Sequence, residues 1–526
     1  AGTKMYFSDM NLSLSQFSPG QWAHLEFDLK GDLGQQNVAL KGETDLNIAV
    51  TLDDASLKQT EFNVSYSDAS NKFNDISFTI DQFSFDTWAN ISLKAIGKAN
   101  ALNVNSISTF ALYVPKALDV IQVKDFSSTN NIKGKGIPNE DVTAVIGFNS
   151  TFDLKKSFLS INTLSLSAVD TDFTGKMSVQ LNDIPKVRFE LRSPNIDVDA
   201  LLATLPQSEV TATEKTASNN KELPASKATE VEPDLSALKT LDVAGTIIID
   251  KFKASNAKMQ NVTFVFSVNR GVLKLTKFHS DLYAGAIDMT ATLDARKTTP
   301  TYSIKQSIKG VQVAPLLTDV MGESLIEGNG NMALNVSGKS LKPSALKENL
   351  KGKASINFAD GAVNGVNIPL LIRTTYAKIK GEKVKGSEEA EKTDFSALTA
   401  DFYLSKGNAT TKNIKMVSPL LRIHGEGSAH YVNETANMLI KTSIVGSLKG
   451  QGGKGIDDLK DVTIPIRITG PWAKPKYKLE FDDVMQQKAK KEIDRGIEKL
   501  EEKYGDKIKD EKVKDAANKL LKGLFN

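Results

Sequence analysis

The sequence predicts a mainly β protein, an elongated array of strand-rich repeats with short helices. Apolar and polar residues alternate along many segments, a period-2 pattern typical of strands with one apolar and one polar face. A pattern of strands, a glycine, further strands and a short leucine-rich helix also recurs, which indicates growth by stacking of repeats. Polar outer faces and frequent turn residues favour antiparallel pairing.

The alternating segments follow one another from the N-terminal part to residue 468. Their apolar members are Leu46, Ile48, Val50 and Leu52; Phe62, Val64 and Tyr66; Ile76, Phe78 and Ile80; Val187, Phe189 and Leu191; Val262, Phe264, Phe266 and Val268; Met332, Leu334 and Val336; and Val462, Ile464, Ile466 and Ile468. Residues of the other parity, such as Arg188 and Glu190, are mostly polar. We therefore expect each strand to turn one apolar face toward a shared surface.

Short helices are expected where each repeat ends. The clearest two lie at 196–202 and 311–317, and a fainter one lies at 112–118. Gly175 precedes the helix expected at 196–202, and Gly285 occupies the matching position before the helix expected at 311–317. Each glycine is followed by a strand.

Composition divides the chain into four parts. Residues 1–205 and 235–481 carry the strand pattern, and 206–234 is a linker or insertion rich in Thr, Ala, Ser, Lys and Glu. Polar segments at 380–393 and 446–455 are expected to be loops. Residues 482–526 are expected to form a charged, amphipathic helical tail, with an apolar stripe at Ile493, Ile497, Leu500, Tyr504 and Ile508. This tail either caps the sheet or docks on a membrane or partner.

Charge and cysteine content exclude several classes of protein. A net charge of +3 on 526 residues does not predict nucleic-acid binding. The chain has no cysteine, so disulfides, thiolate metal sites and cysteine nucleophiles are absent. Its longest apolar runs fall far short of the roughly 20 residues that span a bilayer. We expect the sequence to start within a structured region, because its first residues show no basic segment followed by an apolar core.

No catalytic motif is present in the sequence. We find no nucleophile elbow, no zinc-protease motif, no dinucleotide-binding glycine motif and no calcium-binding loop. The chain has four histidines, and the spacing of His424 and His430 is a weak metal signal. We therefore expect a protein that is not an enzyme, with no catalytic residues, no metal and no cofactor.

The function depends on what covers the apolar faces of the strands. Few long helices are expected before residue 482, so helices alone do not cover these faces. Two sheets that face each other would form an ordinary sandwich core. A single twisted sheet, curved into an apolar groove that stays partly open, would instead be a binding surface, since monomers rarely expose large apolar patches. Periodicity alone does not choose between the two.

Three stretches go beyond generic strand patterning. They are Asn269 to Arg296, with Gly271 and Gly285; Gly352 to Val366, with Asp360 and Gly361; and Lys406 to Gly427, with Ser418 and Pro419. The closing segment from Val462 to Pro475 has the same character. Together they resemble the middle and C-terminal region of the AsmA family of Gram-negative bacteria, most strongly from Leu241 to Leu479.

The resemblance implies a bridge-like lipid-transfer protein of the periplasm. Family membership implies an inner-membrane anchor through an N-terminal helix absent from this chain, and phospholipid transfer between the two membranes in support of outer-membrane biogenesis and integrity. An outer-membrane or periplasmic protein is a further expected partner. The alternative function is a non-catalytic scaffold or assembly factor for outer-membrane proteins, with a closed sandwich core.

The groove implied by the resemblance has candidate lining residues. They are the large apolar members of the regular strands, which on this hypothesis contact phospholipid acyl chains: Ile48, Val50, Phe62, Val64, Phe78, Phe189, Phe264, Phe266, Met289, Leu334, Phe358 and Ile466. Each of them would be an ordinary core residue if the sheet were closed.

Overall fold

The computed structural model describes residues 6–34, 36–205, 230–379, 390–445 and 463–480. The chain divides into two compact units. Unit 1 comprises Ala1–Thr229, Asp234–Asp281 and Asp294–Arg296, and unit 2 comprises Glu230–Pro233, Leu282–Leu293 and Lys297–Asn526. The predicted tail at 482–526, the loop at 446–455 and most of the predicted linker and of the 380–393 loop lie outside the described residues.

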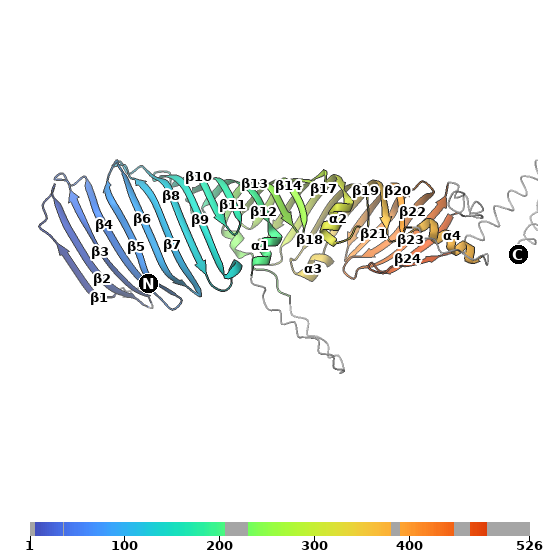
Figure 1. Cartoon of the computed structure of the whole chain (residues 1–526), viewed down its shortest axis with the longest axis horizontal. Helices are drawn as coiled ribbons and strands as arrows, with labels where there is room; N and C mark the ends of the chain where they lie inside the picture. The colour runs from blue at the N-terminus through green and yellow to red at the C-terminus, as the bar shows by residue number, and fades with distance from the viewer. Residues whose placement is uncertain (1–5, 35, 206–229, 380–389, 446–462, 481–526) are drawn as a thin grey trace, which may run out of the picture. The chain divides into compact units, whose positions relative to one another are not determined.

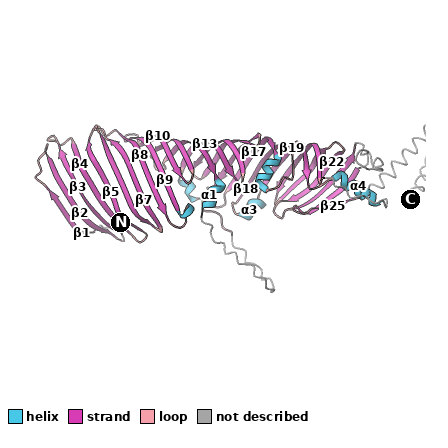
Figure 2. Ribbon diagram, in the orientation of Figure 1, coloured by secondary structure: helices cyan, strands magenta, loops and turns pink. Residues whose placement is uncertain are grey.

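Strands dominate both units, and the described helices are few and short (Figure 2). The prediction of a mainly β fold with a curved, open antiparallel sheet and few helices is confirmed. The boundaries between the four regions stay a prediction, because they were drawn from composition and the two units are defined by compactness.

In unit 1 the strands lie side by side in chain order (Figure 1). They are β1 (Tyr6–Leu14), β2 (Trp22–Leu33), β3 (Gln36–Ile48), β4 (Ala55–Ser67), β5 (Asn71–Ser84), β6 (Trp88–Ala99), β7 (Leu102–Tyr113), β8 (Val120–Lys133), β9 (Asp141–Asp153), β10 (Phe158–Ala168), β11 (Thr171–Gln180), β12 (Lys186–Asp197), β13 (Asp242–Ala254), β14 (Ala257–Asn269) and β15 (Val272–Leu282). The helical segments are η1 (Pro138–Glu140), α1 (Val198–Thr204) and η2 (Ser236–Thr240).

Pairing in unit 1 is antiparallel between sequence neighbours from β1 to β12, as in a meander. β12 and β13 pair in parallel, because the chain crosses over between them through α1 and the segment that follows it. Most of the antiparallel pairs contain a register shift, such as the one between Val123 and Phe126. Bulges of this kind bend a strand and increase its twist, so they account for the curvature of the sheet.

Unit 2 continues with strands and carries more helix. Its strands are β16 (Gly285–Asp294), β17 (Thr301–Gln312), β18 (Asn329–Lys339), β19 (Lys351–Asn364), β20 (Lys392–Ser405), β21 (Asn408–Val417), β22 (Leu421–His430), β23 (Thr435–Ile444), β24 (Thr463–Pro471) and β25 (Lys476–Leu479). Its helices are α2 (Val313–Met321), α3 (Pro343–Glu348) and α4 (Ile368–Ile379). From β17 to β25 each strand pairs antiparallel with the next.

Two of the predicted short helices form and one does not. α1 and α2 confirm the helices expected near 196–202 and 311–317. The helix expected at 112–118 is wrong: β7 ends at Tyr113, and a turn closed by Leu118 N–H donating to Pro115 O leads into β8. The apolar pattern there belongs to the strand end and the turn.

The strand predicted through Leu52 also ends too late. β3 stops at Ile48, and Leu52 adopts a φ of 58°, inside the turn before β4. Val50 and Leu52 are 74% and 71% exposed there. The alternation of apolar and polar residues at 46–52 therefore continues past the end of β3 and does not indicate where the strand ends.

Candidate functional site

Alternate residues of β2–β14 build one apolar face, which we call the trough face. Cross-strand partners in a sheet point to the same side, so the register traces rows of side chains across many strands. One row contains Leu12, Phe27, Gly42, Phe62, Phe78, Leu93, Ser108, Ser128, Ile146, Leu166 and Phe173. A parallel row contains Thr60, Ile80, Ile91, Phe110, Phe126, Phe148, Leu164, Gly175, Leu191, Ile247 and Phe264.

Phenylalanine rings contact one another along these rows. The ring centroids of Phe62 lie 5.4 Å from Phe27 and 5.9 Å from Phe78, the second pair stacked. Phe126 and Phe148 stack at 4.2 Å. Gly42 makes this packing possible, since a Cβ atom there would lie 2.5 Å from the Phe62 ring and 2.8 Å from the Phe27 ring. The rings thus form two aromatic clusters on the trough face, one on β2–β5 and one on β7–β9.

The polar residues in these rows satisfy one another. Thr44 and Thr60 hydroxyls lie 2.6 Å apart, and Ser108 Oγ donates to Ser128 Oγ at 2.9 Å. All four side chains are buried. Because paired hydroxyls leave no unsatisfied polar atom, the trough face stays effectively apolar across these strands.

Burial distinguishes the two faces of unit 1. The fully buried residues of β2–β14, such as Ala89, Ile161 and Val262, all lie on the trough face, whereas the large rings beside them are half-buried. The described strands pair within one open sheet, and no second sheet packs against them. The sandwich alternative is therefore wrong for unit 1, and its apolar side chains remain partly accessible.

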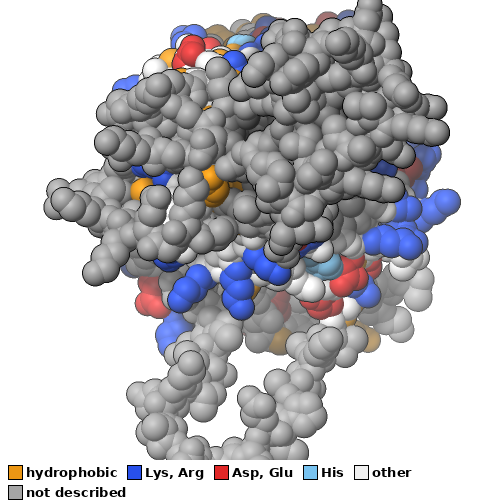
Figure 3. Space-filling model, turned by 90° about the vertical axis from the view of Figure 1, so that its right-hand side faces the viewer, with side chains coloured by type: hydrophobic (Ala, Val, Ile, Leu, Met, Phe, Trp, Pro, Cys, Tyr) orange, Lys and Arg blue, Asp and Glu red, His pale blue; other side chains and the backbone are white. Residues whose placement is uncertain are grey.

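The opposite face carries charges paired across strands. Lys94 Nζ lies 2.8 Å from Asp75 and Lys133 Nζ lies 2.8 Å from Asp141. Such exposed pairs contribute about 0–1 kcal/mol each to the free energy of unfolding. Their main effect is to mark this face as the one that contacts solvent. Seen from the right-hand side of Figure 1, the described surface carries side chains of both charges, with Lys and Arg beside Asp and Glu (Figure 3).

A hollow of about 520 Å³ crosses β10–β14 and has many polar lining residues from this outer face. Its cations already have partners: Lys176 lies 2.9 Å from Glu190, and Arg188 lies 2.7 Å from Asp242. The hollow therefore offers apolar and neutral polar surface more than free positive charge.

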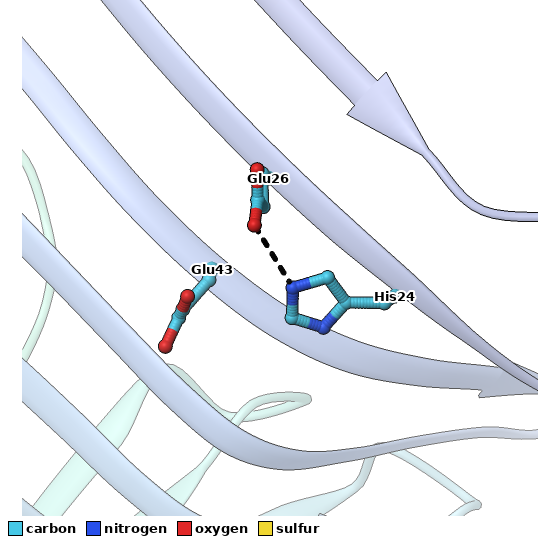
Figure 4. Close-up of side chains that lie close together, drawn as sticks. All are labelled: His24, Glu26 and Glu43. Atoms are coloured by element: carbon cyan, nitrogen blue, oxygen red, sulfur yellow. Dashed lines mark ion pairs between the residues drawn. The ribbon is translucent and has the colours of Figure 1, made fainter.

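Figure 4 shows a group of three titratable side chains on β2 and β3, His24, Glu26 and Glu43. They lie on the exposed outer face, and Glu26 and Glu43 are direct cross-strand partners. His24 Nδ1 donates to Asp45 at 2.7 Å, and this bond raises the pKa of His24. A protonated His24 offsets the repulsion between neighbouring carboxylates, which accounts for the grouping without a metal ion.

The twelve candidate lining residues occupy three different environments. Nine are half-buried on strands: Ile48, Phe62, Val64, Phe78, Phe189, Phe264, Phe266, Met289 and Leu334. The register brings the seven of these that belong to unit 1 onto the trough face. Their contact with lipid stays a prediction.

Three candidates lie elsewhere. Val50 is in the turn after β3, where its side chain approaches Gly20 instead of the sheet face. Phe358 and Ile466 are only 4% and 2% exposed, inside the core of unit 2. At these two positions the closed-core alternative is correct, because helices cover this part of the sheet, and we remove both residues from the open lining.

Sequence reasoning missed several trough-face residues, among them Phe27, Phe110, Phe126 and Phe148. A bulge near residue 125 shifts the parity of the alternation within β8, and small polar residues such as Ser108 and Ser150 interrupt the apolar alternation of β7 and β9. A search for alternation on either side of an interruption would have found these residues.

A largely antiparallel open sheet with an apolar face on one side places the chain in the class of open β-sheet proteins. The AsmA family model matches residues 2–414, so the chain belongs to the AsmA family. It is similar to Protein AsmA of Escherichia coli (strain K12), at 24% identity over 403 residues. That match covers 74% of this chain and 63% of the relative, so the chain spans less than two thirds of the relative's length.

The predicted resemblance is confirmed, and the match reaches further toward the N-terminus than the motifs after Leu241 indicated. The closing segment at 462–475 lies beyond the matched residues. No helix of the described residues is long and apolar enough to cross a membrane.

Proposed function

We propose that this protein binds phospholipid acyl chains along the trough face of unit 1 and transfers phospholipid between the inner and outer membranes. The observation that carries this proposal is the pair of cross-strand rows, which run over ten or more strands and whose phenylalanine rings are only half-buried. Membership of the AsmA family supports a role in the assembly of the bacterial envelope. We place the protein in the periplasm, anchored to the inner membrane in the full-length protein.

Binding on this face follows from the hydrophobic effect. Each methylene removed from water contributes about 0.8 kcal/mol, so a whole acyl chain is held strongly. Positions within an aromatic cluster are chemically alike, because the rings of Phe27, Phe62 and Phe78 follow one another at similar spacing. A bound chain therefore slides between positions of similar free energy, and movement along the row needs no chemical step.

The headgroup stays outside the apolar rows in this proposal. Charged side chains such as Lys94 and Asp75 are confined to the outer face, so the trough face has no partner for a phosphate. An ionic headgroup buried there would lose its hydration without compensation. The proposed ligand is thus recognised by its chains, and one outer-membrane or periplasmic protein is the proposed receiver.

Native mass spectrometry of the detergent-free protein tests this function. We expect phospholipid to copurify with the protein, and the delipidated protein to take up phospholipid from vesicles. A stable protein that carries no lipid and takes up none would contradict the proposal. The scaffold function would then be favoured, with a protein partner in place of lipid.

A further inference from the structure

Helix α4 lies on the apolar face of unit 2. Its Ile372 and Tyr376 are 1% and 4% exposed and pack in a cluster with strand residues. The strand members of this cluster come from β19–β24 and are Phe358, Phe395, Leu398, Met416, Leu421, Ile423, Ile440, Ile444, Ile464 and Ile466. α2 adds Val313, with Leu317 at the margin. The cluster is the closed core of unit 2.

The sheet under α4 is built like the trough face of unit 1. The register aligns one row from Phe358 through Leu398, Met416, Ile423 and Thr442 to Ile464. Every member of this row is buried, whereas the equivalent rings of unit 1 are half-exposed. The strands supply the same apolar row in both units, and a covering helix makes the difference.

α4 belongs to an insertion in a β-hairpin, not to the sheet. Asn364 at the end of β19 pairs with Lys392 at the start of β20, so the inserted residues leave and re-enter the sheet at neighbouring points. Gly365 follows β19 with a φ of 84°, which glycine adopts without strain. Among the described side chains of α4, Ile372 and Tyr376 are the buried ones. The other described side chains of the helix are half-buried, apart from the exposed Lys378, and a glycine joins the helix to β19.

We propose that α4 covers a second acyl-chain site, on the apolar face of unit 2, and that an acyl chain displaces it. This inference rests on the proposed function. A long acyl chain offers apolar surface to the same strand residues that Ile372, Tyr376 and Ile368 contact, so it compensates for contacts that the helix gives up. The site takes single, long, saturated or unsaturated chains, since its row is continuous and without charge.

Palmitate is the probe for this site. In hydrogen exchange of the wild-type protein, saturating palmitate is expected to raise the exchange rates of the α4 amides at least several-fold. Ile372→Ser weakens the packing of α4 on the sheet, so we expect it to lower the palmitate Kd. The expected change is about tenfold, because burial of one apolar side chain changes an equilibrium constant by about that factor. Lys378→Ser, at an exposed position of the same helix, is the matched control and should leave the Kd unchanged.

The outcomes separate this inference from the proposed function. The site under α4 is overturned if palmitate binds without changing the exchange rates of the α4 amides and with equal Kd in Ile372→Ser and Lys378→Ser. Unit 1 is then the binding surface. A wild-type protein and an Ile372→Ser variant that both fail to bind palmitate overturn the two proposals together. The exchange measurement needs no variant, so it decides the question even where Ile372→Ser does not fold.

Discussion

Gly245 lies directly against the ring of Phe189, its cross-strand partner in the parallel pair β12–β13. A Cβ atom on Gly245 would come within 2.4 Å of the ring, a separation that real Cβ atoms do not adopt. The glycine therefore lets the Phe189 ring lie flat over β13 and approach Phe266, whose ring centroid is 5.8 Å away. The absence of one methyl group shapes this part of the trough face.

Gly245→Ala is expected to destabilise unit 1 by about 1–3 kcal/mol, because overpacking pushes the Phe189 ring out of place. Urea unfolding measures the change. The double variant Gly245→Ala with Phe189→Leu should recover part of the loss, since the smaller side chain leaves space for the methyl group. Additive effects in this double-mutant cycle would show that the two residues do not interact.

His24 gives a pH dependence with a defined sign. The hydrogen bond to Asp45 raises the pKa of His24, with a smaller contribution from Glu26. The stabilisation from this pair is therefore fully present below the unfolded-state pKa of 6.5 and is lost as pH rises through the folded-state pKa.

An NMR titration of the His24 ring checks this prediction. The pKa should lie above 6.5 in the wild-type protein and fall in Asp45→Asn, while Glu26→Gln produces a smaller decrease. An equal pKa in the wild-type protein and Asp45→Asn would rule out the assigned cause.

Thr393 anchors the start of α4. Its hydroxyl donates to Val366 O at 2.6 Å and accepts from Ile368 N–H at 3.1 Å, and the side chain is 1% exposed. Thr393→Val keeps the shape but leaves both backbone groups without this partner, so we expect a loss of about 1–3 kcal/mol in urea unfolding. Ser396→Ala, at an exposed position of β20, is the control and should change little. Equal stability of the two variants would contradict this role.

The sequence predicted the fold class because alternation records which face of a strand is buried. It placed Phe62, Phe78, Phe189 and Phe264 on regular strands, and the structure brings them to one face. It did not predict where a strand ends, as Val50 shows, since a turn with a positive φ carries no periodic signal.

The sequence also did not predict which apolar strand faces a helix covers. Phe358 and Phe62 have the same pattern around them, yet α4 buries one while the other stays half-exposed. Which face a helix covers depends on contacts distant in sequence. The spacing of Ile372 and Tyr376, with Pro369 near the first turn, was the local signal for α4 itself.

Phe62→Asp is expected to reduce copurified and captured phospholipid at least about tenfold, because a charge on the trough face lies where an acyl chain would bind. The matched control is Asn63→Asp, which adds a negative charge to the same strand on the exposed outer face. Native mass spectrometry gives the lipid content, and circular dichroism verifies that both variants fold. Equal lipid content in the two variants would place the lipid elsewhere.

Photo-crosslinking with diazirine-labelled palmitate, followed by peptide mapping of the full chain, shows directly which face binds acyl chains. We expect adducts on trough-face residues of β4–β10, such as Phe62, Phe78 and Phe148, with outer-face neighbours such as Asn63 and Thr79 unlabelled. Adducts confined to the outer face, or none in unit 1 despite bound palmitate, would show that the trough face is not the acyl-chain site.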